Sequence, residues 1–138
     1  MREILFRGKA INRDIGEHRT NYKNGDWVYG LVTRLYDERF ENLPAQMTDA
    51  NGVSGIEVDY ETIGQYTGLT GSGKRIFEGD IVITKAKSCE FVGCIAYSTE
   101  YVRFLCVTKS KNPYPMDSVF DYEIIGNIYD NPELLKGE

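Results

Sequence analysis

The segment from Thr62 to Val82 constrains the fold of this chain more than any other stretch. It reads TIGQYTGLTGSGKRIFEGDIV, in which apolar, β-branched and aromatic residues lie on both sides of a glycine cluster. Two such runs joined by a short glycine-containing turn are typical of a β-hairpin. Glu78-Gly79-Asp80 is typical of a second turn that opens another strand. The segment therefore predicts a strand, a glycine hairpin, a strand and a Gly-Asp turn.

Similar β-type runs recur along the chain, which contains ten Tyr, six Phe and one Trp. These residue types favour pleated, half-buried surfaces. Near the C-terminus, Asn131 and Pro132 predict the start of a short helix, with Asn131 as its N-cap. We therefore predict a mainly all-β fold with a short C-terminal helical turn. The strands are expected within Glu3–Lys9, Trp27–Tyr36, Ile56–Asp59, Thr62–Thr67, Arg75–Phe77, Ile81–Thr84, Phe91–Tyr97, Tyr101–Thr108 and Tyr122–Tyr129.

A loss of periodicity marks a division of the chain. Residues 37–55 combine Pro44 with several Asp, Asn and Gly residues, which predicts a long loop or a boundary. At 138 residues, the chain has room for one domain or for two very small ones. We predict an N-terminal β region with long loops over residues 1–55 and a C-terminal region over residues 56–138. Gly25-Asp26 and Gly79-Asp80 both precede apolar strands and leave open a structural repeat.

Charge and cysteine content restrict the partners and the compartment. The net charge of −5 divides into +2 over residues 1–39, −5 over 40–82 and −2 over 83–138. Because no segment is a basic cluster, a nucleic-acid partner is not expected. Three cysteines are too few for a disulfide framework, and no apolar run approaches the ~20 residues of a membrane span. We expect a cytoplasmic protein with reduced thiols and no membrane partner.

One motif imitates a phosphate-binding loop. Gly68 to Lys74 matches the G-x-x-x-x-G-K pattern, but Arg75 stands where that loop carries the Ser or Thr that ligates magnesium. The turn at Gly79 also leaves no room for the helix whose N-terminus binds the phosphates. We expect instead a hairpin in which Gly71 and Gly73 supply positive φ angles.

The remaining candidate groups favour structural roles. Asp80 is expected to accept hydrogen bonds from turn amides, and Asp26 is expected to do the same. The single histidine, His18, lies in a polar stretch without a nucleophile motif. Cys94 and Cys106 are predicted to share one face of a hairpin as small apolar residues. We expect no catalytic residue, no cofactor and no metal site.

Several blocks of residues follow one another in a recognisable order over nearly the whole chain. The blocks are Arg2-Glu3-Ile4 with Phe6-Arg7, Val58-Asp59, Glu61 to Gly68, Ile76 to Val82, Ile125 to Tyr129 and Asn131 to Leu135. In this order they resemble the YopX family of proteins encoded by phages and prophages. Tyr60 departs from the family, which more often has proline there, and the loop before Lys74 more often carries Asp and Asn. Both departures lie in turns.

The resemblance implies an SH3-like barrel in the C-terminal half, preceded by a smaller β region, and a phage or prophage gene. It implies no established activity and no catalytic residues. The leading hypothesis is a non-enzymatic accessory protein of the bacterial host's cytoplasm that binds another protein or self-assembles. Its candidate binding surface comprises Tyr66, Lys74, Asp80 and Tyr129.

Two other functions are left open. The first is small-ligand binding or catalysis by the charged turn from Lys74 to Asp80, which concentrates several ionisable residues. The weaker one is nucleic-acid binding through the barrel, which the positive balance of residues 1–39 keeps open.

Overall fold

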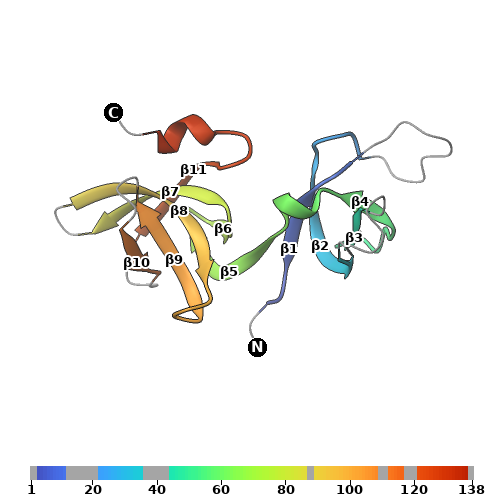
Figure 1. Cartoon of the computed structure of the whole chain (residues 1–138), viewed down its shortest axis with the longest axis horizontal. Helices are drawn as coiled ribbons and strands as arrows, with labels where there is room; N and C mark the ends of the chain where they lie inside the picture. The colour runs from blue at the N-terminus through green and yellow to red at the C-terminus, as the bar shows by residue number, and fades with distance from the viewer. Residues whose placement is uncertain are drawn as a thin grey trace. The chain divides into compact units, whose positions relative to one another are not determined.

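The chain is all-β, as the sequence predicts. The computed structural model describes residues 3–11, 22–35, 44–86, 89–108, 112–116 and 121–136. Within them lie strands β1 to β11 and the short 3₁₀ helices η2 and η3 (Figure 1). The chain divides into two compact units, Met1–Gln65 (unit 1) and Tyr66–Glu138 (unit 2).

Unit 1 is an antiparallel sheet with the strand order β4-β3-β2-β1-β5, of which only the first residues of β5 belong to this unit. Phe6 pairs with Gly30 of β2 on one side and with Gln65 of β5 on the other. The elements are β1 (Phe6–Lys9), β2 (Trp27–Arg34), β3 (Ala45–Asp49), β4 (Ile56–Val58), η2 (Tyr60–Thr62) and β5 (Gly64–Gly71).

The sheet of unit 1 curls around its own core. Val28, Met47 and Val58 are fully buried and form the centre of this core. Beyond the end of β1, Ala10 forms an isolated bridge with Val58 of β4, so the two strands meet. The bridge is flanked by backbone hydrogen bonds from the Ile11 amide to the Glu57 carbonyl and from the Asp59 amide to the Lys9 carbonyl, both 2.8 Å.

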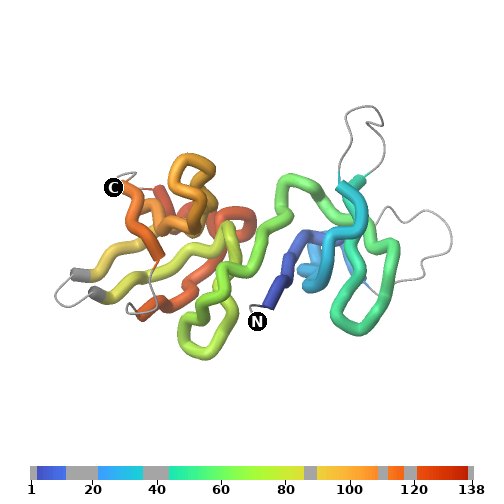
Figure 2. The backbone as a smooth tube through the Cα atoms, turned by 90° about the horizontal axis from the view of Figure 1, so that it is seen from below, coloured from blue at the N-terminus to red at the C-terminus, as the bar shows by residue number. Residues whose placement is uncertain are grey.

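Unit 2 contains a five-stranded antiparallel sheet in the order β10-β9-β8-β7-β11 and the hairpin of β5 and β6. The hairpin is the yellow-green loop in Figure 2. Helix η3 packs against β8. The further elements are β6 (Lys74–Phe77), β7 (Asp80–Ala86), β8 (Cys89–Ser98), β9 (Arg103–Thr108), β10 (Pro113–Pro115), β11 (Asp121–Asn127) and η3 (Pro132–Leu135).

One face of the five-stranded sheet carries the core of unit 2. Alternate residues of a strand share a face, which places Val82 and Thr84 on the same side of β7. The register continues this side across the sheet, because Thr84 lies opposite Tyr122 of β11 and Phe91 of β8. The buried members of the core are Ile76, Val82, Ile95, Cys106, Met116 and Tyr122.

Two strands lie where the sequence predicts irregular chain. β3 lies inside the predicted loop of residues 37–55, and its Ala45, Met47 and Asp49 alternate as buried residues. β10 lies between the predicted strands Tyr101–Thr108 and Tyr122–Tyr129, where no strand is predicted. Unit 1 extends to Gln65, beyond the predicted boundary after residue 55, because β4 pairs with β3.

The predicted glycine hairpin is confirmed, but its left-handed positions differ. Gly71 pairs with Lys74, and the turn residues between them are Ser72 at φ 52° and Gly73 at φ 80°. Gly71 itself has no positive φ. It is required for close approach, because a Cβ there would lie 2.5 Å from the carbonyl oxygen of Tyr122.

Candidate binding pocket

The structure places Asp80 in a structural position, as the sequence analysis expects. Its side chain is buried, with 2% exposed, and Oδ2 accepts a 2.8 Å hydrogen bond from the Phe77 amide. Gly79 between them has φ +94°, so the carboxylate stabilises a tight turn before β7. The carboxylate is therefore part of the fold and does not project into solvent.

Three of the four predicted surface residues gather around this turn. The Tyr66 ring lies 5.8 Å from the Phe77 ring, and a Cβ at Gly79 would come within 3.1 Å of the Tyr129 ring. Lys74 is exposed at the opposite end of β6, three residues from Phe77, which corresponds to about 10 Å along a strand. Tyr66, Asp80 and Tyr129 therefore lie together, and Lys74 does not join them.

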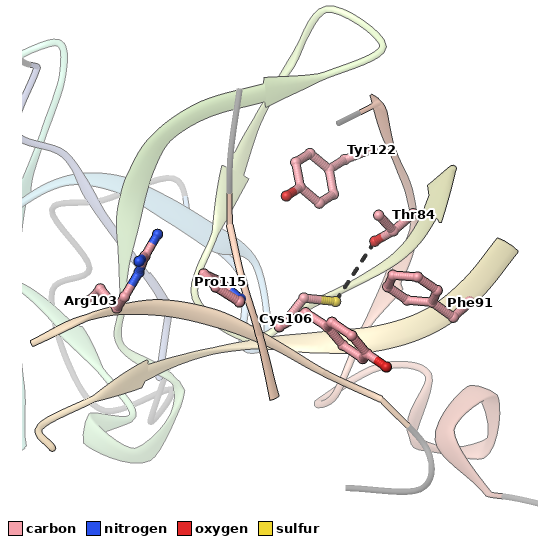
Figure 3. A pocket seen from close by; sticks show the side chains of 7 residues that line it. Thr84, Phe91, Arg103, Cys106, Pro115 and Tyr122 are labelled. Carbon is pink, nitrogen blue, oxygen red and sulfur yellow. Dashed lines mark hydrogen bonds between the residues drawn. The ribbon is translucent and has the colours of Figure 1, made fainter. Parts of the chain in front are cut away.

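A pocket of about 300 Å³ opens elsewhere in unit 2 (Figure 3). None of the predicted surface residues lines it. Strands β7, β8, β9, β10 and β11 all contribute to its wall, so the pocket depends on the whole five-stranded sheet. The lining residues are Thr84, Phe91, Arg103, Cys106, Tyr114, Pro115 and Tyr122.

Aromatic rings form one wall of the pocket. Phe91 of β8 and Tyr114 of β10 stack with ring centroids 4.8 Å apart and an interplanar angle of 27°. Tyr114 lies opposite Cys106 of β9 in the strand register, so its ring is anchored to the sheet through β10. Backbone bonds on both sides, from Thr108 to Asn112 and from Met116 to Phe104, hold β10 in place.

Thr84 and Cys106 line the pocket beside Tyr122. The Thr84 Oγ1 and Cys106 Sγ atoms lie 3.8 Å apart and form a weak hydrogen bond. Burial raises the pKa of the Cys106 thiol, and the bond with Thr84 offsets only part of this effect. Cys106 therefore stays protonated at neutral pH, and a thiol is a poor nucleophile compared with a thiolate. Chemically, this part of the pocket is an apolar contact surface.

Arg103 supplies the positive charge of the pocket. In Figure 3 its guanidinium lies at the opposite end from Phe91, with Cys106 and Pro115 between them. Its Nη2 donates a 3.2 Å hydrogen bond to the Met116 carbonyl, which orients the group. Within the described part of the chain Arg103 forms no ion pair, so most of its five N–H donors remain available.

None of the pocket residues is predicted from the sequence as a binding residue. Phe91 and Cys106 lie on predicted strands, but prolines flank Tyr114 on both sides, and no strand is predicted there. The predicted shared face of Cys94 and Cys106 is also wrong. Cys106 lies opposite Ile95, the neighbour of Cys94, so the two cysteines point to opposite faces.

The candidate groups for other chemistry are not brought together. No cluster of three His, Cys, Asp or Glu side chains suitable for a metal ion occurs among the residues that the structure describes. His18 and the Cys89 side chain lie outside them. Neither 3₁₀ helix in the described ranges is long and apolar enough to cross a membrane.

Comparison with known proteins assigns the family. A family model described as YopX protein matches residues 11–136. The chain belongs to the YopX family. The fold of this YopX-family protein is similar to the crystal structure of protein EF1440 from Enterococcus faecalis, with a TM-score of 0.53 and 25% sequence identity. The similarity covers 99% of this chain and 100% of that chain. The comparison with curated proteins found no match.

Proposed function

We propose that this YopX-family chain is a phage- or prophage-encoded accessory protein that acts by binding a polypeptide partner through the pocket of unit 2. It would work in the cytoplasm of the bacterial host. The observation that carries the proposal is the stacked pair of Phe91 and Tyr114 beside a pocket of about 300 Å³. Aromatic walls with a few polar groups are typical of sites that bind apolar side chains.

The proposal includes an SH3-like architecture for unit 2. Its support is the strand arrangement, in which the hairpin of β5 and β6 accompanies a five-stranded antiparallel sheet. Gly71 at the end of β5 lies against the backbone of Tyr122 in β11, and Ile76 of β6 belongs to the core of the sheet. In this arrangement β10 and β11 are the two outer strands, and the pocket lies between them.

Binding is favoured over catalysis by the chemistry of the pocket. Cys106 is the pocket's nucleophilic candidate, and its raised pKa keeps it as a thiol. The hydroxyl of Thr84 is engaged with that same sulfur. The charged turn from Lys74 to Asp80 is a weaker candidate site, because Asp80 is buried in its own turn.

Binding of a separate partner is also favoured over self-assembly through the β10 edge. Asn112 and Met116 hydrogen-bond to β9, so strand alternation directs the backbone groups of Pro113 and Pro115 to the outer side. Proline has no N–H group to donate to an added strand. This edge therefore discourages pairing with another copy, and the pocket is the better recognition surface.

A peptide-display selection with the full-length protein tests the proposal. Selected peptides would be measured for affinity against the wild type, a Tyr114→Ala variant and a Tyr101→Ala control. Tyr101 is 61% exposed in the turn after β8 and does not line the pocket. We expect Tyr114→Ala to weaken binding by about tenfold or more, since aromatic anchors dominate such contacts.

The Tyr101→Ala control distinguishes loss of the pocket from a general effect of removing an exposed tyrosine. Equal affinity of the wild type and Tyr101→Ala, with loss in Tyr114→Ala, supports recognition through the pocket. Equal loss in both variants, or binding that neither change affects, would overturn it. Circular dichroism of each variant shows that the sheet has folded.

A further inference from the structure

We propose that the pocket recognises the C-terminal residue of its polypeptide partner, with an aromatic side chain inside and the terminal carboxylate on Arg103. This inference rests on the proposed function and specifies the partner's chemistry. The partner's side chain would contact the Phe91–Tyr114 stack, and its carboxylate would contact the guanidinium of Arg103 at the opposite end of the pocket.

The position of Arg103 supports an anionic group on the partner. The Met116 carbonyl holds its Nη2 at 3.2 Å, so part of the orientation is fixed before a ligand arrives. A guanidinium carries five N–H donors in a planar fork that matches the two oxygens of a carboxylate. Arg103 forms no ion pair within the described ranges, which leaves this fork available for an external carboxylate.

The size and polarity of the pocket restrict the rest of the partner. A volume of about 300 Å³ is at the lower end of the range for ligand pockets and suits a single large side chain. Phe91 and Tyr114 cover one face of each other, and the remaining surface of this stack together with the Pro115 ring favours an aromatic group. The partner must therefore present an aromatic side chain and a carboxylate that together span the pocket from the Phe91–Tyr114 stack to Arg103.

A chain terminus satisfies this requirement within one residue. The C-terminal residue carries its side chain and its carboxylate on the same Cα atom. An internal aspartate or glutamate would have to supply the charge from a neighbouring residue, and the intervening backbone would add polar groups to an apolar space. Burying such groups without hydrogen-bond partners is unfavourable. The terminus is thus the simplest polypeptide ligand that fits both ends.

The test uses two small probes, N-acetyl-L-phenylalanine and its carboxamide, titrated into the full-length protein and followed by NMR. The two probes share a side chain and differ in charge. We expect the acid to bind about tenfold more tightly, as a charge-assisted hydrogen bond implies. The shifts should centre on Arg103, Cys106 and Tyr114. Arg103→Gln should remove the preference for the acid, and Arg103→Lys should retain part of it.

The outcomes separate this inference from the proposed function. Equal binding of acid and amide in the pocket would overturn recognition of the terminus and leave peptide binding standing. A preference for the acid that survives in Arg103→Gln would likewise overturn recognition of the terminus and leave peptide binding standing. If neither probe binds and display-selected peptides are unaffected by Tyr114→Ala, both proposals fail. If selected peptides bind through Tyr114 equally well as acids and as amides, only the terminus inference fails.

Discussion

At the scale of single residues, Val102 is a strained position. It has a φ of 53° in the turn between β8 and β9, and its side chain is 73% exposed. A left-handed conformation costs an ordinary L-residue about 1–2 kcal/mol, whereas asparagine tolerates it. We therefore expect Val102→Asn to raise the free energy of unfolding by about 1 kcal/mol in urea denaturation. Tyr101→Asn, at an exposed neighbour without positive φ, should change it little. Equal effects of the two substitutions on the free energy of unfolding would contradict backbone strain at Val102.

Asp49 is a second residue whose contribution can be measured, in this case through the pH dependence of the protein's stability. Its carboxylate accepts a 2.8 Å hydrogen bond from the Val53 amide, and further bonds from the Asn51 amide and the Tyr22 hydroxyl. The Val53 bond is the largest cause that lowers the pKa of Asp49 below its ordinary value of 3.8. This stabilisation is present above the ordinary pKa and is lost as pH falls through the lower, folded-state pKa.

Unfolding of the wild type and of Asp49→Asn should therefore diverge in acid. Protonation of Asp49 removes its preference for the folded state, and an asparagine has no such proton to gain. From about pH 5 to about pH 3, the wild type should lose more stability than Asp49→Asn in chemical denaturation. Parallel pH profiles for the two proteins would show that Asp49 contributes nothing to the acid response.

At the scale of elements, the two Gly-Asp turns share a local geometry. Asp26 Oδ2 accepts a hydrogen bond from the Lys23 amide and Asp80 Oδ2 accepts one from the Phe77 amide, each at 2.8 Å and three residues back. The preceding glycines have φ values of 90° and 94°. The Gly-Asp pairs that precede two predicted strands thus correspond to the same turn at the start of β2 and of β7.

The surroundings of the two turns differ, and so should the effect of removing each carboxylate. Asp80 is buried, whereas Asp26 is exposed and its amide partner can bond to water instead. An unsatisfied buried donor costs about 1–3 kcal/mol. We expect Asp80→Ala to lower the free energy of unfolding by that amount and Asp26→Ala to lower it by less than about 1 kcal/mol. Denaturant titrations compare them directly, and a larger loss for Asp26→Ala would refute the role of burial.

The elements also show what the sequence reveals and what it hides. Long aromatic runs such as β2 and β8 were predictable, because local alternation specifies them. The register of β11 also shifts between Ile124 and Gly126, where the sequence places a glycine inside the strand. By contrast, β3 and β10 are three to five residues long and follow or contain proline, so their pairing partners stabilise them more than their own sequence does.

The pocket could not be predicted from the sequence because it too depends on strand pairing. Phe91 and Tyr114 stack only because β10 pairs with β9 in the register that sets Tyr114 opposite Cys106. A register between strands is a nonlocal property, and a shift of one residue turns every side chain to the other face. Three residues of the predicted surface lie near Gly79 instead, and one of them, Asp80, stabilises that turn.

At the scale of the whole molecule, each unit has a core of its own. Val28, Met47 and Val58 are among the residues buried in unit 1, and Ile76, Ile95 and Tyr122 are among those buried in unit 2. The two clusters share no residue. Because burial of apolar side chains supplies most of the driving force for folding, each cluster should stabilise its own unit.

Hydrogen exchange of the full-length protein tests this independence with one core substitution in each unit. Met47→Ala and Ile95→Ala each remove a side chain that is at most 1% exposed, which costs about 2–5 kcal/mol. We expect Met47→Ala to speed amide exchange in β2 and β3 and to leave β8 and β9 protected, and Ile95→Ala to do the reverse. Local opening then follows the unit that contains the cavity. If either substitution lowers protection equally in both units, the chain unfolds as one cooperative body. In that case β5, which continues from unit 1 into unit 2, would couple the two units.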